Sequence, residues 1–159
     1  MGSDSGATAT ASRPTPPAIR LAVDELAPDA AGALDAASRR STLDPSLLEL
    51  VGARVAQLNG CADCVDLHSR DARTGGETER RLYALPVWRE TPFFSPTERA
   101  ALDLAEAGTR ISQGPVGDDV FQRAADAFSE RELAELIWVI AVINTWNRLG
   151  AIARPWRLG

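Results

Sequence analysis

The amino-acid sequence predicts an all-α fold in one domain. From Ala27 onward, nearly every segment spaces its apolar residues three and four positions apart, as on one face of a helix, and no segment alternates apolar and polar residues as a half-buried strand does. The chain has 159 residues, of which 45% are hydrophobic and 25% charged, values typical of a single soluble domain with a substantial core. We therefore expect one domain of six or seven helices over residues 21–159.

Capping residues and glycines mark the expected helix ends. An Ala-rich helix is expected over 30–40, and Asp44-Pro45 predicts the start of a second helix that ends at Asn59-Gly60. A third helix is expected over 61–73. Four more helices are expected over 77–85, 96–109, 119–127 and 130–153, and the second and last of these follow a Ser-x-x-Glu capping box.

The N-terminal segment and the overall charge exclude several classes of partner. Residues 1–20 are rich in Ser, Thr, Ala and Pro, so we expect a disordered tail there, and they lack the pattern of a secretory signal. No segment reaches the roughly 18 apolar residues that a membrane span needs. The net charge of −5, without a dense basic stripe, argues against nucleic acid as a partner. We therefore expect a cytoplasmic protein that binds neither nucleic acid nor a membrane.

The two cysteines and the single histidine of the chain lie within eight residues of one another. If a helix starts near Cys61, then Cys61, Cys64 and His68 share one face of it. Cys64 would lie in the first turn, where free backbone N–H groups and the helix dipole lower the pKa of a thiol. Glu49 lies on the preceding helix, and antiparallel packing through the short turn would bring it beside His68. The pattern predicts a redox-active dithiol with an acid–base pair.

These residue types also suggest a role for each side chain. We assign Cys64 as the nucleophile because it is one helical turn from His68, which can accept its proton. Cys61 is then the resolving thiol, which captures a sulfenic acid on Cys64 as a disulfide. Glu49 would orient the imidazole of His68 and relay protons.

Other interpretations of the cysteine pair remain open at this point. One Cys-x-x-Cys with a histidine and a carboxylate can bind zinc, although structural zinc sites usually have four Cys or His ligands. Buried, unreactive cysteines on an apolar helix face are another alternative. A thioredoxin fold fits poorly because its Cys-x-x-Cys follows a strand.

Two segments of the chain resemble the alkylhydroperoxidase AhpD family, within the wider carboxymuconolactone decarboxylase-like group. The first runs from Leu47 through Glu49 to the segment Asn59-Gly60-Cys61-Ala62-Asp63-Cys64-Val65-Asp66-Leu67-His68. The second, Asn144-Thr145-Trp146-Asn147-Arg148, is similar to an Asn-x-Trp-Asn-Arg segment near the end of many such proteins. The resemblance covers about 43–153. AhpD has a histidine just before its second cysteine, where this chain has Asp63.

The resemblance implies a single AhpD-like helical domain that forms a homo-oligomer, commonly a trimer or a hexamer. It implies a peroxidase in which hydroperoxide oxidises Cys64, Cys61 resolves it, and Glu49 and His68 relay protons. The preferred hypothesis is thus a thiol-dependent hydroperoxide reductase without a cofactor or a metal, restored by an external dithiol reductant protein. The alternatives are a non-catalytic oligomer that senses oxidant or binds zinc, and a decarboxylase-like enzyme of the same fold.

Several aromatic residues have two interpretations each. The segment 146–148 can line the site, although a tryptophan at helical spacing is more often a packing residue. Trp88, Phe93 and Phe94 can form a wall of the substrate pocket, but core packing is favoured for them. Trp138 and the apolar run 137–143 are expected in the core or at a subunit interface.

Overall fold

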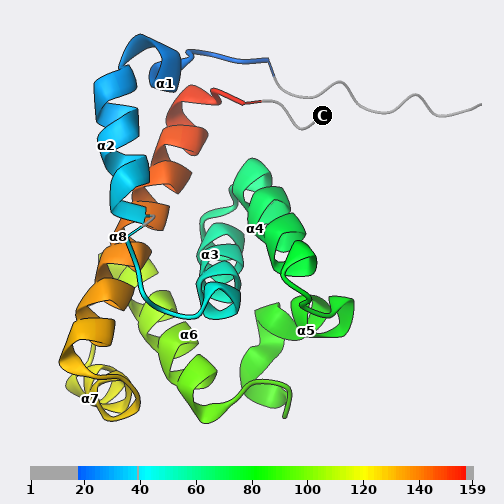
Figure 1. Ribbon diagram of the computed structural model, residues 1–159, viewed down its shortest axis with the longest axis vertical. Helices are drawn as coiled ribbons and strands as arrows, with labels where there is room; N and C mark the ends of the chain where they lie inside the picture. The colour runs from blue at the N-terminus through cyan, green and yellow to red at the C-terminus, as the bar shows by residue number, and fades with distance from the viewer. Residues whose placement is uncertain (1–17, 39, 157–159) are drawn as a thin grey trace, which may run out of the picture.

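The computed structural model describes residues 18–38 and 40–156, and this part of the chain contains only helices and loops (Figure 1). The all-α prediction is confirmed. The elements are α1 (Val23–Leu26), α2 (Pro28–Ser38), α3 (Pro45–Asn59), α4 (Ala62–Thr74), α5 (Glu79–Ala84), the 3-10 helix η1 (Leu85–Glu90), α6 (Pro96–Thr109), the 3-10 helix η2 (Ile111–Gln113), α7 (Asp118–Ala127) and α8 (Glu130–Ala153).

The described chain thus has eight α-helices, one more than the upper expectation. The additional helix is α1, whose four residues are too few to show a periodic apolar pattern. Residues 1–17 of the expected tail lie outside the described residues. The backbone N–H groups of Arg20 and Leu21 both donate to the carbonyl of Ala153, at 3.1 and 3.0 Å, so the described chain begins beside the end of α8.

The helix ends follow the capping signals in the sequence. Asp44 caps α3 by accepting a hydrogen bond from the Ser46 N–H at 2.7 Å, with proline as the first helical residue. Gly60 ends α3 with φ of 68°, a left-handed conformation that glycine adopts without strain. Both predicted capping boxes form, at the starts of α6 and α8. The expected start of the third helix at Cys61 shifts by one residue, because Cys61 is the N-cap of α4.

Helix α3 lies at the centre of the fold and packs against α4, α6 and α8 (Figure 1). The larger core cluster joins α3 to α6, α7 and α8, and its members include Val51, Val55, Leu104, Leu136 and Ile140. A second cluster lies on the other side of α3 and contains Leu50, Leu85, Trp88, Phe94 and Leu102, with Phe93 packed against it. The favoured core interpretation of these aromatic residues is therefore confirmed.

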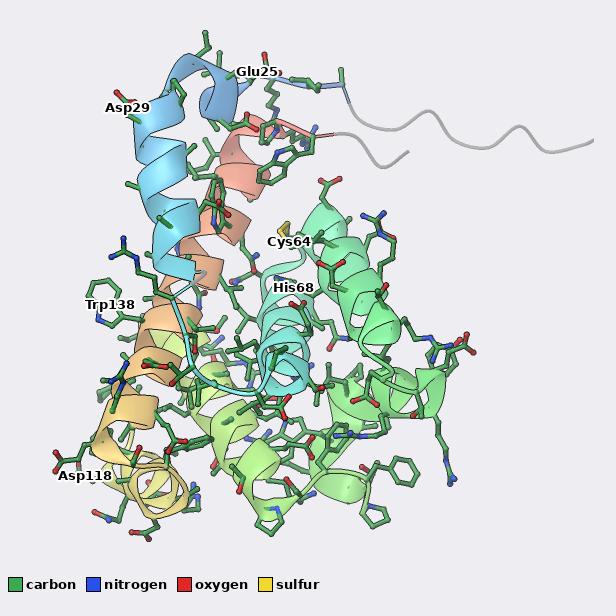
Figure 2. All side chains as sticks on the ribbon, in the orientation of Figure 1. Glu25, Asp29, Cys64, His68, Asp118 and Trp138 are labelled. Atoms are coloured by element: carbon green, nitrogen blue, oxygen red, sulfur yellow. A yellow bond between two sulfur atoms is a disulfide. The ribbon has the colours of Figure 1, made fainter. Side chains whose placement is uncertain are left out.

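The longest helix, α8, is buried along one side and exposed along another. Val139, Ile140 and Ile143 are buried, whereas Ile137 is 43% and Trp138 68% exposed, and Figure 2 shows Trp138 projecting away from the bundle. By length and composition alone α8 could cross a membrane, but this is weak evidence because a core helix passes the same test. The core interpretation holds for the buried side; an interface on the exposed side stays a prediction.

A buried carboxylate ties α3, α6 and η1 together. Glu106 is 2% exposed and accepts hydrogen bonds from Arg54 Nε at 2.6 Å, Trp88 Nε1 at 2.9 Å, Arg89 Nη1 at 2.6 Å and Arg110 Nη1 at 3.4 Å. Burial by itself raises the pKa of Glu106, but the donors of Arg89, Trp88 and Arg54 outweigh it and hold that pKa below its ordinary value. This cluster fixes the position of α3, the helix that carries Glu49.

Candidate active site

The turn between α3 and α4 places the two cysteines at the start of a helix. Cys61 is the N-cap of α4 and Cys64 lies in its first turn, and the two are joined by a disulfide with their Cα atoms 5.3 Å apart. Each residue is only 6% exposed. The first backbone N–H groups of a helix have no intrahelical acceptor, and Cys64 lies among these positions at the start of α4. The prediction that Cys61 and Cys64 lie together at a helix start is confirmed.

Helix α3 runs back alongside α4 and brings Glu49 to His68, as the sequence predicted. His68 Nδ1 donates to Glu49 Oε2 at 2.8 Å, and the two side chains are 19% and 27% exposed. A carboxylate is an acceptor, so this contact places the Nδ1 proton toward Glu49 and leaves Nε2 as the nitrogen that can exchange a proton. Figure 2 shows His68 on the side of α4 that faces α3.

The imidazole of His68 lies directly over a glycine in the middle of α3. A Cβ atom added to Gly52 would come within 2.5 Å of His68 Nδ1 and 2.6 Å of its Cε1, closer than real side chains allow. Only glycine therefore leaves room for this ring position. Gly52 was not among the site residues expected from the sequence, although a glycine inside a helical pattern is a recognised signal because it lowers helix stability.

A cavity of about 750 Å³ opens beside Cys64. Cys64, Glu49 and His68 all line it, so three of the four predicted site residues share one cavity. The apolar part of its wall consists of Leu48, Leu67, Val139, Ile143, Trp146 and Trp156. The charged part consists of Asp35, Asp63, Asp66 and Arg70, together with Glu49 and His68.

Cys61 lies on the closed side of the disulfide. A Cβ atom added to Gly150 of α8 would lie 3.3 Å from Cys61 Sγ and 3.2 Å from the ring of Trp156. Trp156 is held in place because its Nε1 donates to Asp24 Oδ2 at 3.2 Å and its ring packs on Trp146, with centroids 6.0 Å apart. Cys61 is thus packed against α8, whereas Cys64 borders the cavity.

A chain of asparagines lies behind the disulfide. Asn59 Nδ2 donates to Asn144 Oδ1 at 3.0 Å and to Asn147 Oδ1 at 2.9 Å. Arg148 Nη1 also donates to Asn144 Oδ1, at 3.0 Å. Asn147 is 1% exposed and lines the cavity, yet its Nδ2 group is buried without a hydrogen-bond partner. An unsatisfied buried donor typically costs about 1–3 kcal/mol.

The structure shows how the cavity-lining and packing interpretations of residues 146–148 apply to each residue. Trp146 and Asn147 line the cavity, and Trp146 also packs on Trp156, so the favoured packing role holds together with the lining role. Arg148 instead holds Asn144. The contacts of Asn59 were not expected from the sequence, because its partners on α8 are distant in sequence. Within residues 18–38 and 40–156, no group of three or more His, Cys, Asp or Glu side chains is placed to hold a metal ion.

These observations define a class of protein. It is a small helical bundle that has a cysteine pair at a helix start and, beside it, a histidine–glutamate pair that borders the same cavity. The chain matches the carboxymuconolactone decarboxylase family over residues 25–107, more than half of its length. It therefore belongs to this family, whose fold includes enzymes such as AhpD and carboxymuconolactone decarboxylase.

Two curated relatives cover most of the same region. The chain is 42% identical over 112 residues to the uncharacterized protein YdfG of Bacillus subtilis (strain 168), a match that covers 70% of this chain and 76% of that protein. It is 38% identical over 113 residues to the uncharacterized protein YnjA of Escherichia coli (strain K12), covering 71% of this chain and 62% of that protein.

Solved structures show the same fold. A protein of unknown function from Agrobacterium tumefaciens, described as a candidate antioxidant defence protein AhpD, superposes with a TM-score of 0.84 and 32% identity over 89% of this chain and 99% of that chain. An uncharacterized peroxidase-related protein from Silicibacter sp. TM1040 superposes with a TM-score of 0.71 and 20% identity over 82% of this chain and 70% of that chain, which supports the fold alone. The AhpD-like fold that the sequence predicted is confirmed.

Proposed function

We propose that this protein is a hydroperoxide reductase that cycles between a dithiol and a disulfide. The Cys64 thiolate attacks the terminal oxygen of a hydroperoxide, the O–O bond breaks, and Cys64 sulfenic acid and an alkoxide form; the alkoxide takes up a proton and leaves as an alcohol. The Cys61 thiol then condenses with the sulfenic acid, which forms the disulfide and releases water. An external dithiol protein supplies two electrons and two protons to restore both thiols.

The observation that carries this proposal is the Cys61–Cys64 disulfide beside a cavity that also holds the His68–Glu49 pair. The two cysteines form a disulfide with their Cα atoms 5.3 Å apart, within the usual range for such a bond. Cys64 borders the cavity and Cys61 packs against α8, which supports the assignment of Cys64 as the sulfur that meets the substrate. The similarity to the Agrobacterium protein supports the same class of activity.

His68 is the group that we propose for proton transfer. Its Nδ1 is engaged with Glu49, and both His68 and Cys64 border the cavity, so a water molecule in the cavity can carry the proton between Cys64 and Nε2. Glu49 then acts by orienting the ring and by stabilising the imidazolium that forms when His68 takes the proton. Asp63 stands where AhpD has a histidine. It also borders the cavity, but it carries a carboxyl group instead of an imidazole.

The partners expected from the sequence remain part of the proposal. They are a hydroperoxide, an external dithiol reductant protein and further copies of this chain in a trimer or hexamer in the cytoplasm. The exposed Ile137 and Trp138 on α8 support a contact between copies, since large apolar side chains are favoured at interfaces. Light scattering of the wild type and of Trp138→Glu tests this: a smaller assembly for the variant supports the contact, and an unchanged mass contradicts it.

Peroxide consumption in the presence of a dithiol reductant tests the catalytic proposal. The wild type is expected to turn over many equivalents, and Cys64→Ser to lose this activity; equal rates in the two proteins would contradict the assignment of Cys64. Mass spectrometry after one equivalent of peroxide should show the loss of two hydrogen atoms at Cys61 and Cys64. A single oxidation without turnover would instead favour the oxidant-sensing alternative, and stoichiometric zinc would favour the metal-binding one.

The His68–Glu49 pair favours a second candidate, a decarboxylase-like enzyme. The pair borders the cavity independently of the sulfurs, and a histidine held by a carboxylate is a suitable base for removing a proton from a small lactone. The family match is consistent with this chemistry. Decarboxylation of a small lactone by the Cys61→Ser/Cys64→Ser protein, lost on His68→Gln, would support it over the peroxidase.

A further inference from the structure

The amide of Asn147 is one of two buried side-chain donors in the described part of the chain that lack a hydrogen-bond partner, the other being Arg81 Nε. Asn147 is 1% exposed, and no described protein atom accepts a hydrogen bond from its Nδ2 group. Buried donors are nearly always satisfied in folded proteins, so this group is available to an acceptor that forms in another state of the protein.

The orientation of this amide is set by its neighbours. Asn144 Nδ2 donates to the carbonyl oxygen of Ile140 at 2.9 Å, and a carbonyl can only accept, so Asn144 Oδ1 must face Asn59. Asn59 therefore presents its Nδ2 group both to Asn144 and to Asn147, and Asn147 must meet it with its oxygen. Turning the Asn147 amide over would place two donors against each other. Its Nδ2 group is thus directed away from the asparagine chain.

Asn147 lies between two contacts that flank the disulfide. On one side it binds Asn59, two residues before Cys61. One helical turn further along α8, Gly150 lies against Cys61 Sγ. Asn147 and Cys64 also line the same cavity. In the disulfide form Nδ2 makes no hydrogen bond to either sulfur.

Reduction creates a strong acceptor at this place. A thiolate carries a full negative charge, and hydrogen bonds to charged groups are stronger than those to neutral ones. The charged groups that line the cavity with Cys64 are Asp35 from α2, Glu49 from α3, and Asp63, Asp66, His68 and Arg70 from α4, while α8 contributes none to this described lining. Carboxylates therefore outnumber cations around the sulfur, and a neutral donor on α8 can stabilise the anion without adding charge.

We propose that Asn147 Nδ2 donates a hydrogen bond to the Cys64 thiolate when the disulfide is reduced. The proposal rests on the dithiol cycle above in one respect, that the cysteine pair is reduced at some stage. The donor lacks a partner in the disulfide form, which destabilises that form. It gains a partner in the dithiol form, which stabilises the reduced protein. Asn147 thereby keeps Cys64 ionised and makes the disulfide more oxidising, as any group that stabilises the reduced form does.

Two variants of Asn147 test this assignment. Asn147→Leu removes the donor with little change of volume. Asn147→Asp keeps an oxygen for Asn59 and replaces the Nδ2 group by a second acceptor, so it preserves the asparagine chain if the leucine variant fails to fold. Thr145→Val is the control, because Thr145 lies on the exposed side of α8 and its hydroxyl donates only within the helix, to Ala141.

The first measurement is the pH dependence of iodoacetamide alkylation of Cys64, in a Cys61→Ser background so that one thiol reports. The thiolate fraction below the pKa of Cys64 should fall about tenfold in Asn147→Leu and further in Asn147→Asp, with no change in Thr145→Val. The second is a redox titration of the intact pair against glutathione. A tenfold destabilisation of the reduced form lowers the potential by about 30 mV.

Neither measurement uses peroxide, so the inference and the proposed function can fail separately. A higher pKa of Cys64 and a lower potential in both variants support the inference, even if the wild type does not reduce hydroperoxides. The inference is overturned if, in both variants, the equilibrium constants for Cys64 ionisation and for reduction of the disulfide stay within twofold of the wild-type values, even if peroxide turnover is intact. An equal shift in Thr145→Val would also overturn it, since the effect would then come from α8 as a whole.

Discussion

The two buried polar clusters of this protein differ in how completely they are satisfied. The cluster around Glu106 has four donors on one carboxylate and lies between packed helices, away from the cavity that Cys64 borders. The cluster around the cysteine pair lies at a cavity, contains the unpartnered Asn147 amide, and holds its histidine through one carboxylate. Both sit against α3, so one helix carries a cluster of each kind.

This contrast indicates which of the two clusters contributes to stability and which to reactivity. A network in which every hydrogen-bonding group is paired fixes one arrangement of the helices and leaves no group free to bind a ligand. An unsaturated one costs stability and keeps donors, acceptors and a titratable ring available for reaction. Changes at Glu106 should therefore alter the free energy of unfolding more than reactivity, and changes at the cavity should do the reverse.

The largest expected effect is on stability, from Glu106→Ala. Removing the carboxylate leaves the mostly buried Arg54 without its partner, and breaking a buried ion pair in this way costs about 3–5 kcal/mol. Urea denaturation measures the change. The alkylation rate of Cys64 in protein that remains folded should stay within about twofold. A stable variant with a slowed Cys64 would reverse the comparison.

The next effect is on activity, from Glu49→Gln. We expect the rate of hydroperoxide reduction to fall about a hundredfold, as when an acid–base group is lost. The free energy of unfolding should change by less than about 1 kcal/mol, because the His68–Glu49 pair is partly exposed. Glu90→Gln, at an exposed carboxylate of η1, is the matched control and should alter neither. A loss of stability as large as that of Glu106→Ala would show that the pair is structural.

A smaller effect on activity is expected from Gly52→Ala. Alanine usually stabilises a helix by about 0.5–1 kcal/mol relative to glycine, but here its Cβ would displace the His68 ring. Peroxide reduction should fall between about 10- and 100-fold, as a displaced catalytic group would cause. Gly108→Ala provides the comparison within α6, since its Cβ would meet Ile140 Cγ2 at an ordinary 3.4 Å, and its activity should be unchanged. Full activity of Gly52→Ala would show that the ring position is not required.

The smallest effect is a pH dependence of stability at Glu106. Its pKa is lowered in the folded protein, so its contribution to stability is complete above the pKa of a glutamate in the unfolded chain, about 4.3. That contribution is lost as the pH falls further through the lowered folded pKa. Urea midpoints of the wild type between pH 7 and pH 3 should therefore drop in acid, and those of Glu106→Gln should drop less. Parallel curves would contradict the assignment.

Local signals were sufficient for most of the fold. The capping boxes at Ser95 and Ser129, the Asp44-Pro45 start and the Gly60 end each involve atoms within a few residues, so the helix ends could be predicted without tertiary information. The four-residue α1 could not, because four residues are too few to show an apolar face, and the residue that donates to its Asp24 side chain, Trp156, is distant in sequence.

The parts of the site that were predicted are those whose geometry follows from the short turn between α3 and α4. Cys61 and Cys64 meet because they are neighbours at a helix start, and Glu49 meets His68 because a short turn makes α3 and α4 antiparallel. The roles of Gly52 and Asn147 could not be predicted from the sequence. Those roles depend on which side chains lie opposite these residues in the fold.

The helices, the cysteine pair and the identity of the groups able to react could thus be read from the amino-acid sequence. The fold was needed to show which sulfur borders the cavity, which glycine admits the imidazole, and which amide lacks an acceptor. Capping and helical spacing act over a few residues, whereas α8 comes to the cysteine pair across about 85 residues of chain, a separation seen in the Asn59–Asn144 hydrogen bond.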